Sequence, residues 1–316
     1  MKVFAAILAT TVTCCCGGQD FLHRSLPANV QAAANSRPTA DTGTNAGVVN
    51  VVFTVTDHGG RFVKDLQQSQ FKVLDNNKPP QKMLSFESQT VVPMRVGLLF
   101  DASNSIRDRF LFEQKAAADF VQQVIRPQAD KAFVLAFDEI LDIKQDFTDD
   151  TDKLTAGIKN IHPGGGTAMW DAIYYACRDK LLKERNSGPV RRVIILMSDG
   201  DDNQSRVLRK EAVEMAQRAE VSIYTISTNF SSIHDTGDQH LSMLAEATGG
   251  RAFFPRKLEE MTDAFKEIQA ELRSQYFMSY VPDHFEADGQ FRSIQILPEN
   301  TKLRVRVRKG YFAPRE

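Results

Sequence analysis

Oxygen-bearing side chains occur in three short segments whose composition suits a site for a hard metal ion. The first segment is Asp101-Ala-Ser103-Asn-Ser105, the second ends in Thr167 after three glycines, and the third contains Asp199. Together these residues supply two carboxylates and three hydroxyls, with no imidazole or thiolate among them. Donors of this kind select Mg²⁺, Mn²⁺ or Ca²⁺ over zinc or copper. Because Mg²⁺ takes few protein ligands and keeps several waters, an acidic group of a partner could fill an exchangeable position.

The elements that precede these segments would bring them to one place. Residues 96–100 and 193–197 are continuous apolar runs, as expected of strands buried on both faces, and they lead into Asp101 and Asp199. The glycine loop before Thr167 precedes a predicted helix. Open α/β sheets bind ligands at the carboxyl ends of their strands, where the strand order reverses. We therefore expect the three segments to form a single site at that edge.

Strand and helix patterns alternate along the middle of the chain. The expected strands are residues 95–100, 132–137, 141–147, 192–197, 222–227 and 251–254, and the expected helices are residues 106–124, 152–161, 168–183, 206–218, 239–247 and 258–274. Only Asp138-Glu-Ile joins the second and third strands, which is too short for a parallel crossover, so these two strands must be antiparallel. The pattern predicts a doubly wound, mostly parallel six-stranded sheet of the α/β class, with one antiparallel strand and helices on both faces.

Beta patterns flank this region on both sides. The last one, residues 302–308, alternates aliphatic with basic residues, which predicts one buried face and one solvated basic face. We expect the flanks to pair into a small β-sandwich-like domain with the larger domain inserted into it. The predicted organisation is an export signal at 1–18, a disordered linker at 19–46, a β segment at 47–91, the α/β domain at 92–275, and a β segment at 276–316 that pairs with 47–91.

The beginning of the chain is typical of an export signal rather than of a folded element. Lys2 precedes a short apolar run, which ends at Cys14-Cys15-Cys16 and two glycines. We expect a periplasmic, cell-surface or secreted protein, and a lipid anchor on one of Cys14–Cys16 is an alternative. Thr11-Val12-Thr13 departs from the Leu-Ala-Gly that usually precedes a lipidated cysteine. The remaining cysteine, Cys177, falls on an amphipathic helix, and we expect it to be a small buried hydrophobic residue.

Five further residues lie close to the three oxygen-rich segments. Asp171 is typical of a helix start or of a hydrogen-bonding residue behind the ligands. Asp201 is expected to shape a turn or to tune the local charge. Trp170 could contact a partner at the rim or could pack inward, and both readings stay open. Asn104 and Gly166 complete the set of rim or supporting candidates.

In this order, the motifs Asp-x-Ser-x-Ser, Gly-Gly-Gly-Thr-Ala-Met-Trp-Asp-Ala-Ile and Met-Ser-Asp-Gly-Asp-Asp resemble the von Willebrand factor A family over residues 92–275. The resemblance implies a metal-ion-dependent adhesion site, with direct or water-mediated coordination by Asp101, Ser103, Ser105, Thr167 and Asp199. The flanking motifs Val-Thr-Asp-x-Gly-Gly, Arg-Ser-Gln-Tyr-Phe-Met-Ser-Tyr and Val-Arg-Lys-Gly-Tyr resemble an exported bacterial group abundant in Acidobacteria.

These features favour a binding module over an enzyme. We expect Mg²⁺, or Mn²⁺ or Ca²⁺ in its place, and a protein partner that presents Asp or Glu to the metal. A cell-envelope assembly protein with metal-rigidified loops is the alternative, and a metal-dependent hydrolase is less favoured. The P-loop lysine, the dinucleotide-binding glycines and the esterase Gly-x-Ser-x-Gly elbow are all missing from the relevant segments. A net charge of -1 gives no support to a nucleic-acid partner.

Overall fold

The computed structural model describes residues 47–88, 92–104, 110–184, 188–230 and 235–315. The predicted export signal, the linker and Cys14–Cys16 lie outside the described residues, as does Ser105. Within the described part of the chain, no helix has the length and hydropathy needed to cross a bilayer.

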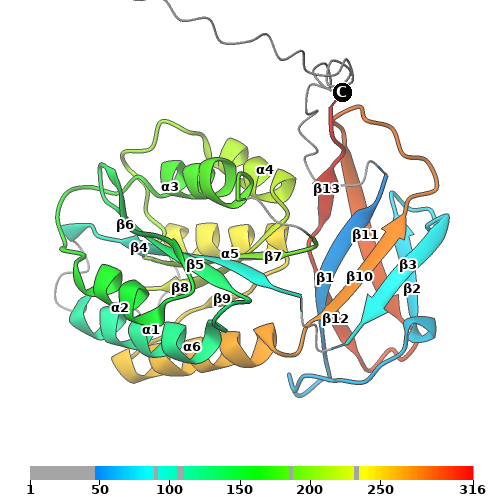
Figure 1. The fold of residues 1–316 in the computed structure, drawn as a ribbon, viewed down its shortest axis with the longest axis horizontal. Coiled ribbons are helices and arrows are strands. Elements are labelled where there is room, and N and C mark those ends of the chain that lie inside the picture. The colour runs from blue at the N-terminus through cyan, green and yellow to red at the C-terminus, as the bar shows by residue number, and fades with distance from the viewer. Residues whose placement is uncertain (1–46, 89–91, 105–109, 185–187, 231–234, 316) are drawn as a thin grey trace, which may run out of the picture. The chain divides into compact units, whose positions relative to one another are not determined.

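A six-stranded sheet forms the centre of the α/β region, in the order β6-β5-β4-β7-β8-β9 (Figure 1). All neighbouring pairs are parallel except β5 and β6, which are antiparallel as the short connection requires. The predicted fold class is confirmed. The strands are β4 (Met94–Asp101), β5 (Lys131–Phe137), β6 (Leu141–Thr148), β7 (Arg191–Ser198), β8 (Val221–Ser227) and β9 (Ala252–Phe253).

Helices cover both faces of this sheet, because the strand side chains alternate between two apolar cores. Val96, Leu98 and Phe100 of β4 pack into the core under α1, α2 and α6, whereas Leu99 packs into the core under α3, α4 and α5. Figure 1 shows α1, α2 and α6 on one side of the sheet and α3 and α4 on the other. The helices are α1 (Phe110–Val124), α2 (Thr151–Lys159), α3 (Met169–Tyr175), α4 (Arg209–Arg218), α5 (Thr236–Thr248) and α6 (Leu258–Leu272).

Three helices differ clearly from the sequence-based expectation. Helix α4 begins at Arg209, three residues later than predicted. The segment predicted as one helix over 168–183 is α3 followed by a π-helical turn, Ala176–Leu181. This turn buries Cys177 completely, as expected for that residue. Helix α5 begins three residues earlier than predicted because Asp235 caps it, its side chain accepting a hydrogen bond from Asp238 N.

The flanking segments pair with each other into two antiparallel sheets, β12-β1-β10-β3 and β13-β11-β2. Their apolar faces share one core, which makes them a small β-sandwich. Asp75 lies buried between the sheets, where it accepts hydrogen bonds from Tyr280 Oη (2.8 Å) and Tyr311 Oη (3.0 Å). The strands are β1 (Val49–Thr56), β2 (Phe71–Asp75), β3 (Lys82–Glu87), β10 (Tyr276–Val281), β11 (Phe291–Pro298), β12 (Arg304–Val307) and β13 (Gly310–Phe312).

The basic face of the last predicted strand is not fully solvated, contrary to expectation. Arg306 forms an ion pair with Glu271, which is fully buried at the end of α6. Glu271 also accepts a hydrogen bond from Tyr224 Oη at 2.7 Å. Arg308 is buried and lies 2.9 Å from Glu220, just before β8. These arginines are therefore paired with acidic residues of the α/β region, which no periodicity in their own strand could reveal.

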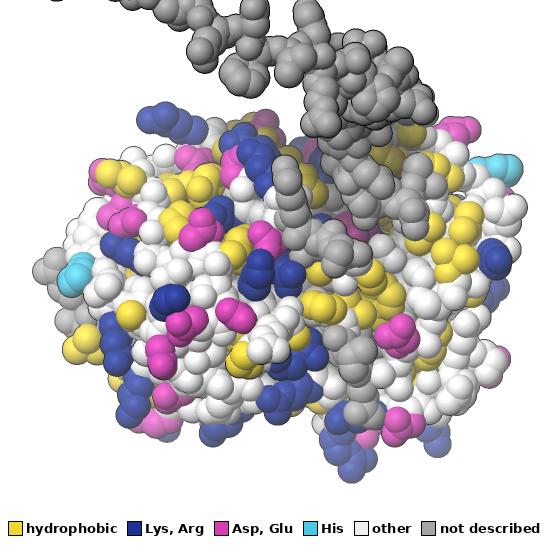
Figure 2. Space-filling view, in the orientation of Figure 1, with side chains coloured by type: hydrophobic (Ala, Val, Ile, Leu, Met, Phe, Trp, Pro, Cys, Tyr) yellow, Lys and Arg dark blue, Asp and Glu magenta, His cyan; other side chains and the backbone are white. Residues whose placement is uncertain are grey.

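Charged side chains of both signs are mixed over the surface drawn in Figure 2. Lys and Arg alternate with Asp and Glu across that face, outside the atoms in grey. This mixing agrees with the near-zero net charge of the sequence.

Candidate metal site

The first oxygen-rich segment begins at the carboxyl end of β4, in the middle of the sheet. Asp101 ends the strand and is 1% exposed. Its Oδ1 accepts a hydrogen bond from Ser103 N (2.9 Å), and its Oδ2 accepts one from Ser198 Oγ (2.7 Å) at the end of β7. Ser103 is also buried, at 4% exposure. The two inner strands thus bring the first and third segments into direct contact.

Backbone hydrogen bonds tie the glycine loop to both neighbouring segments. Gly164 N donates to Ala102 O at 2.6 Å, which joins the loop to the first segment. Asn203 N donates to Thr167 O at 3.1 Å, and Thr167 N donates to Asn203 Oδ1 at 3.0 Å. These contacts fix Thr167, which is 4% exposed, between the first and third segments. Asp101, Ser103 and Thr167 therefore come from segments that contact one another directly.

The turn between β5 and β6 supports the same loops from the side. Ala102 N donates to Phe137 O at 2.7 Å, and Ala168 N donates to Asp138 O at 2.8 Å. A Cβ atom at Gly165, whose φ is +78°, would lie 3.2 Å from the Asp138 side chain. Glycine is thus favoured here both by the backbone conformation and by the close approach of the turn.

The Asp101 carboxyl is in an environment that disfavours its negative charge. Burial raises its pKa to about 6, hydrogen bonds from Ser198 and Ser103 oppose this shift, and the charge of Asp199 raises the pKa further. Asp199 is half-buried and directly follows β7. Within the described residues, Asp101 forms no salt bridge. Buried charges are normally paired or bound to metal, so this carboxylate fits a bound cation.

The donor set fits a hard divalent cation better than a soft one. Asp101 and Asp199 supply carboxylate oxygens, and Ser103 and Thr167 supply hydroxyls. Among the described residues, no group of three or more His, Cys, Asp and Glu side chains is placed to hold a metal ion. A metal at this edge would therefore need hydroxyl or water oxygens in addition to the two carboxylates. Ser105, the fifth predicted ligand, lies outside the described residues.

The neighbouring candidates take different positions around the site. Trp170 packs inward, with 6% of its surface exposed and its ring 5.8 Å from that of His240. Asp171 accepts hydrogen bonds from Arg206 N (3.0 Å) and Val207 N (2.8 Å), so it braces the loop after Asp199. Asp201 is exposed, and its backbone N donates to Asp199 Oδ1 at 3.1 Å.

Asn104 and Gly166 lie on the two loops that face each other. Asn104 Nδ2 donates to Gly165 O at 3.4 Å, and the Asn104 side chain is exposed. A Cβ atom at Gly166 would come within 2.8 Å of Asn203 Oδ1, so this position needs glycine for close packing. Asn104 is therefore at the rim, whereas Gly166 supports the loop.

Two residues that support the site were missed by the sequence reasoning. Ser198 Oγ donates a hydrogen bond to Asp101, and Asn203 Oδ1 accepts one from Thr167 N. Ser198 carries a weak signal, because it is a hydroxyl residue directly after a run of apolar strand residues and directly before Asp199. Asn203 carries no local signal, since its partner lies 36 positions away in the chain.

Comparison with known proteins gives one family and many solved structures of similar fold. The model of the von Willebrand factor type A domain matches residues 96–267, which is more than half of the chain. A search of curated proteins found no match. The site built above lies inside the matched range.

Three solved structures represent the structural matches. Von Willebrand factor type A from Catenulispora acidiphila is 12% identical and has a TM-score of 0.49, with 79% of this chain and 75% of that chain covered. The D319A mutant of the PilB minor pilin from Streptococcus sanguinis is 14% identical, with a TM-score of 0.46 and coverages of 58% and 62%. Proximal thread matrix protein 1 from the mussel byssus, with a zinc-occupied MIDAS motif, is 17% identical, with a TM-score of 0.49 and coverages of 62% and 48%. The chain thus spans less than two thirds of the pilin and of the byssus protein.

Proposed function

This chain belongs to the von Willebrand factor type A domain family. We therefore propose that it is an exported binding module that binds a protein partner through a divalent cation. Asp101, Ser103, Ser105, Thr167 and Asp199 hold the cation, which is Mg²⁺ or, in its place, Mn²⁺ or Ca²⁺. An Asp or Glu side chain of the partner completes the coordination shell. The module needs no catalytic group of its own, and nucleic acid is not its partner.

The buried Asp101 carboxylate is the observation that carries this proposal. Burial and the neighbouring Asp199 both raise the pKa of Asp101. A divalent cation between the two carboxylates would offset their repulsion and leave little net charge at the site. A further acidic group from outside could then approach without a large electrostatic penalty.

The alternative, a structural protein in which the metal mainly rigidifies loops, has less support. The three loops already hold one another through hydrogen bonds between protein atoms, such as Gly164 N to Ala102 O and Ser198 Oγ to Asp101 Oδ2. A cation would add little order to loops connected in this way. Its more useful role is to offer a coordination position to a partner.

Calorimetric titration with Mg²⁺, Mn²⁺ and Ca²⁺ tests the metal part of the proposal. We expect Asp101→Asn and Thr167→Ala to weaken binding by about tenfold or more, since each removes an oxygen from a small ligand set. Asp119→Asn on α1 is the matched control, because Asp119 is exposed and outside the site. Equal affinities for wild type and Asp101→Asn would refute the metal site.

A pull-down from cell-envelope extract tests the partner. Wild type in Mg²⁺ is compared with wild type in chelator and with Asp101→Asn in Mg²⁺. We expect at least one protein to be retained only by wild type in Mg²⁺. The same retained proteins under all three conditions would show that the cation does not mediate recognition.

A further inference from the structure

The three most exposed large hydrophobic side chains among the described residues are Leu111, Ile140 and Leu208. Their exposed fractions are 81%, 73% and 67%, whereas the next such residue, Leu182, is 48% exposed. Single exposed hydrophobic residues are common on protein surfaces and need no explanation. The position of these three in the fold distinguishes them from that background.

All three lie at the carboxyl edge of the central sheet, where the candidate metal site is. Helices α1 and α4 each connect two parallel strands, so both begin at that edge. Leu111 is the second residue of α1, and Leu208 directly precedes α4. Ile140 is in the turn between β5 and β6, whose backbone is hydrogen-bonded to the loops around Ala102 and Ala168.

The sheet topology places these residues on three different sides of Asp101. Leu111 belongs to the helix layer on one face of the sheet, and Leu208 adjoins the helix layer on the opposite face. Ile140 lies beyond β5, on one side of β4 in the strand order. At the carboxyl edge of the sheet, one exposed apolar side chain therefore lies on each of three sides of β4, the strand that ends in Asp101.

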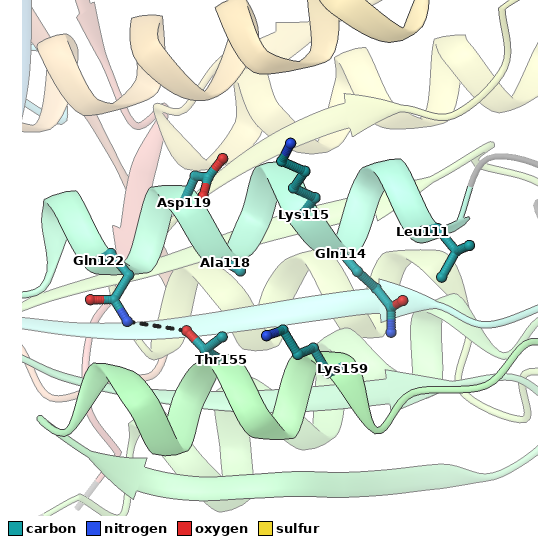
Figure 3. A pocket seen from close by; sticks show the side chains of 8 residues that line it. All are labelled: Leu111, Gln114, Lys115, Ala118, Asp119, Gln122, Thr155 and Lys159. Carbon is teal, nitrogen blue, oxygen red and sulfur yellow. Dashed lines mark hydrogen bonds between the residues drawn. The ribbon is translucent and has the colours of Figure 1, made fainter.

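Leu111 also marks one end of a groove between α1 and α2. The groove has a volume of about 350 Å³, and Figure 3 shows Leu111 at the beginning of α1, apart from the other lining side chains. Farther along, Lys115 and Asp119 point to the same side of α1, so their opposite charges offset each other. Lys159 of α2 also lines the groove, so two lysines are present there with one acidic side chain. The groove therefore offers a path for a chain that leaves the metal site, and its excess positive charge favours acidic groups on that chain.

We propose that Leu111, Ile140 and Leu208 form an apolar collar around the metal site, and that the site therefore takes a protein segment whose acidic residue is flanked by bulky apolar residues. This inference rests on the proposed function and names the class of partner. Contacts between the collar and the flanking residues would exclude water from the metal–carboxylate bond, which strengthens a polar contact at the centre of an interface. Polysaccharides and purely acidic chains lack the bulky apolar groups that would pack against the collar.

Two fluorescein-labelled peptides test the collar by anisotropy in excess Mg²⁺. One carries Leu-Leu-Asp-Leu-Leu, and the other carries Ser-Ser-Asp-Ser-Ser, so both offer the same carboxylate. We expect wild type to bind the leucine peptide roughly tenfold more tightly, since a few buried methylene groups contribute that much. The triple variant Leu111→Ser, Ile140→Ser, Leu208→Ser should bind both peptides equally while keeping the Mg²⁺ affinity of wild type.

The matched control is the double variant Leu182→Ser, Leu297→Ser, which removes exposed leucines away from this edge and should behave as wild type. If wild type bound both peptides with the same affinity, and only in Mg²⁺, the collar would be overturned and the proposed function would stand. Binding of the leucine peptide that persists in chelator, or no binding of it in Mg²⁺, would also overturn the collar. Absence of Mg²⁺ binding to wild type would overturn the proposed function and the collar together.

Discussion

Without its cation, the Asp101 carboxyl should make the stability of the protein depend on pH in an unusual direction. Its pKa in the folded protein is about 6, against 3.8 for an ordinary aspartate, because the carboxyl is buried and close to Asp199. The folded state therefore binds a proton at Asp101 more tightly than the unfolded chain does. The resulting stabilisation is fully present below the unfolded pKa and is lost as the pH rises through about 6.

The size of the effect follows from the pKa shift. The rise of the Asp101 pKa from 3.8 to about 6 corresponds in full to about 3 kcal/mol of unfolding free energy. The interval from pH 7 to pH 5 covers only part of the span between the unfolded and folded pKa values. Over this interval we expect the unfolding free energy of metal-free wild type to rise by about 1.4 kcal/mol because of Asp101. Because a bound cation needs the ionised carboxylate, protonation at pH 5 should also weaken Mg²⁺ binding about tenfold relative to pH 7.

Urea unfolding in chelator at the two pH values measures the first effect, and calorimetric titration measures the second. The Asp101→Asn variant serves as the reference, since other titrating groups contribute equally to both proteins. We expect the difference in unfolding free energy between wild type and Asp101→Asn to change by about 1.4 kcal/mol in favour of wild type as the pH falls. A difference that stays constant with pH would refute the reasoning, because it would mean that Asp101 has an ordinary pKa in the fold.

Three further predictions concern the scaffold. Replacing the buried Glu271 by Ala should cost about 3–5 kcal/mol in urea unfolding, because Arg306 and Tyr224 lose their shared partner; a loss below about 1 kcal/mol would contradict this. Gly200→Ala should lower the melting temperature strongly, since φ is +83° and a Cβ atom would lie 2.2 Å from Gly237 O, whereas Gly188→Ala, with open space around it, should not. Burial raises the pKa of the Cys177 thiol, so a thiol reagent should label this residue only after unfolding, and rapid labelling of the native protein would count against the fold around it.

Most of the α/β architecture follows from local sequence pattern, and the reasons are physical. Continuous apolar runs mark strands covered on both faces, and the three residues between β5 and β6 leave only an antiparallel connection. The closeness of the Asp101 and Asp199 segments follows from the same pattern, because the parallel strands β4 and β7 end at one edge of the sheet. The export signal and the role of Ser105 stay predictions.

The parts that escaped prediction depend on contacts between distant segments. Arg306 and Arg308 look like a solvated basic face in their own strand, yet their acidic partners lie in the α/β region. The hydrogen bonds of Asn203 with Thr167, and those of the β5–β6 turn with the loops of the site, are likewise tertiary contacts. Hydrophobic periodicity reports which side of an element is buried, but it does not identify the partner that covers a polar side chain.

The pairing of β1 with β10 has a mechanical consequence for a module that holds a partner. Strand β10 follows α6 directly, and its first residue, Tyr276, lies opposite Phe53, while Val49 at the start of β1 lies opposite Tyr280. A pull on the chain before Val49, resisted by a load on the α/β region, would slide the two strands along each other. Hydrogen bonds across antiparallel strands run perpendicular to that motion, so all five residue pairs would be strained together rather than opened one after another.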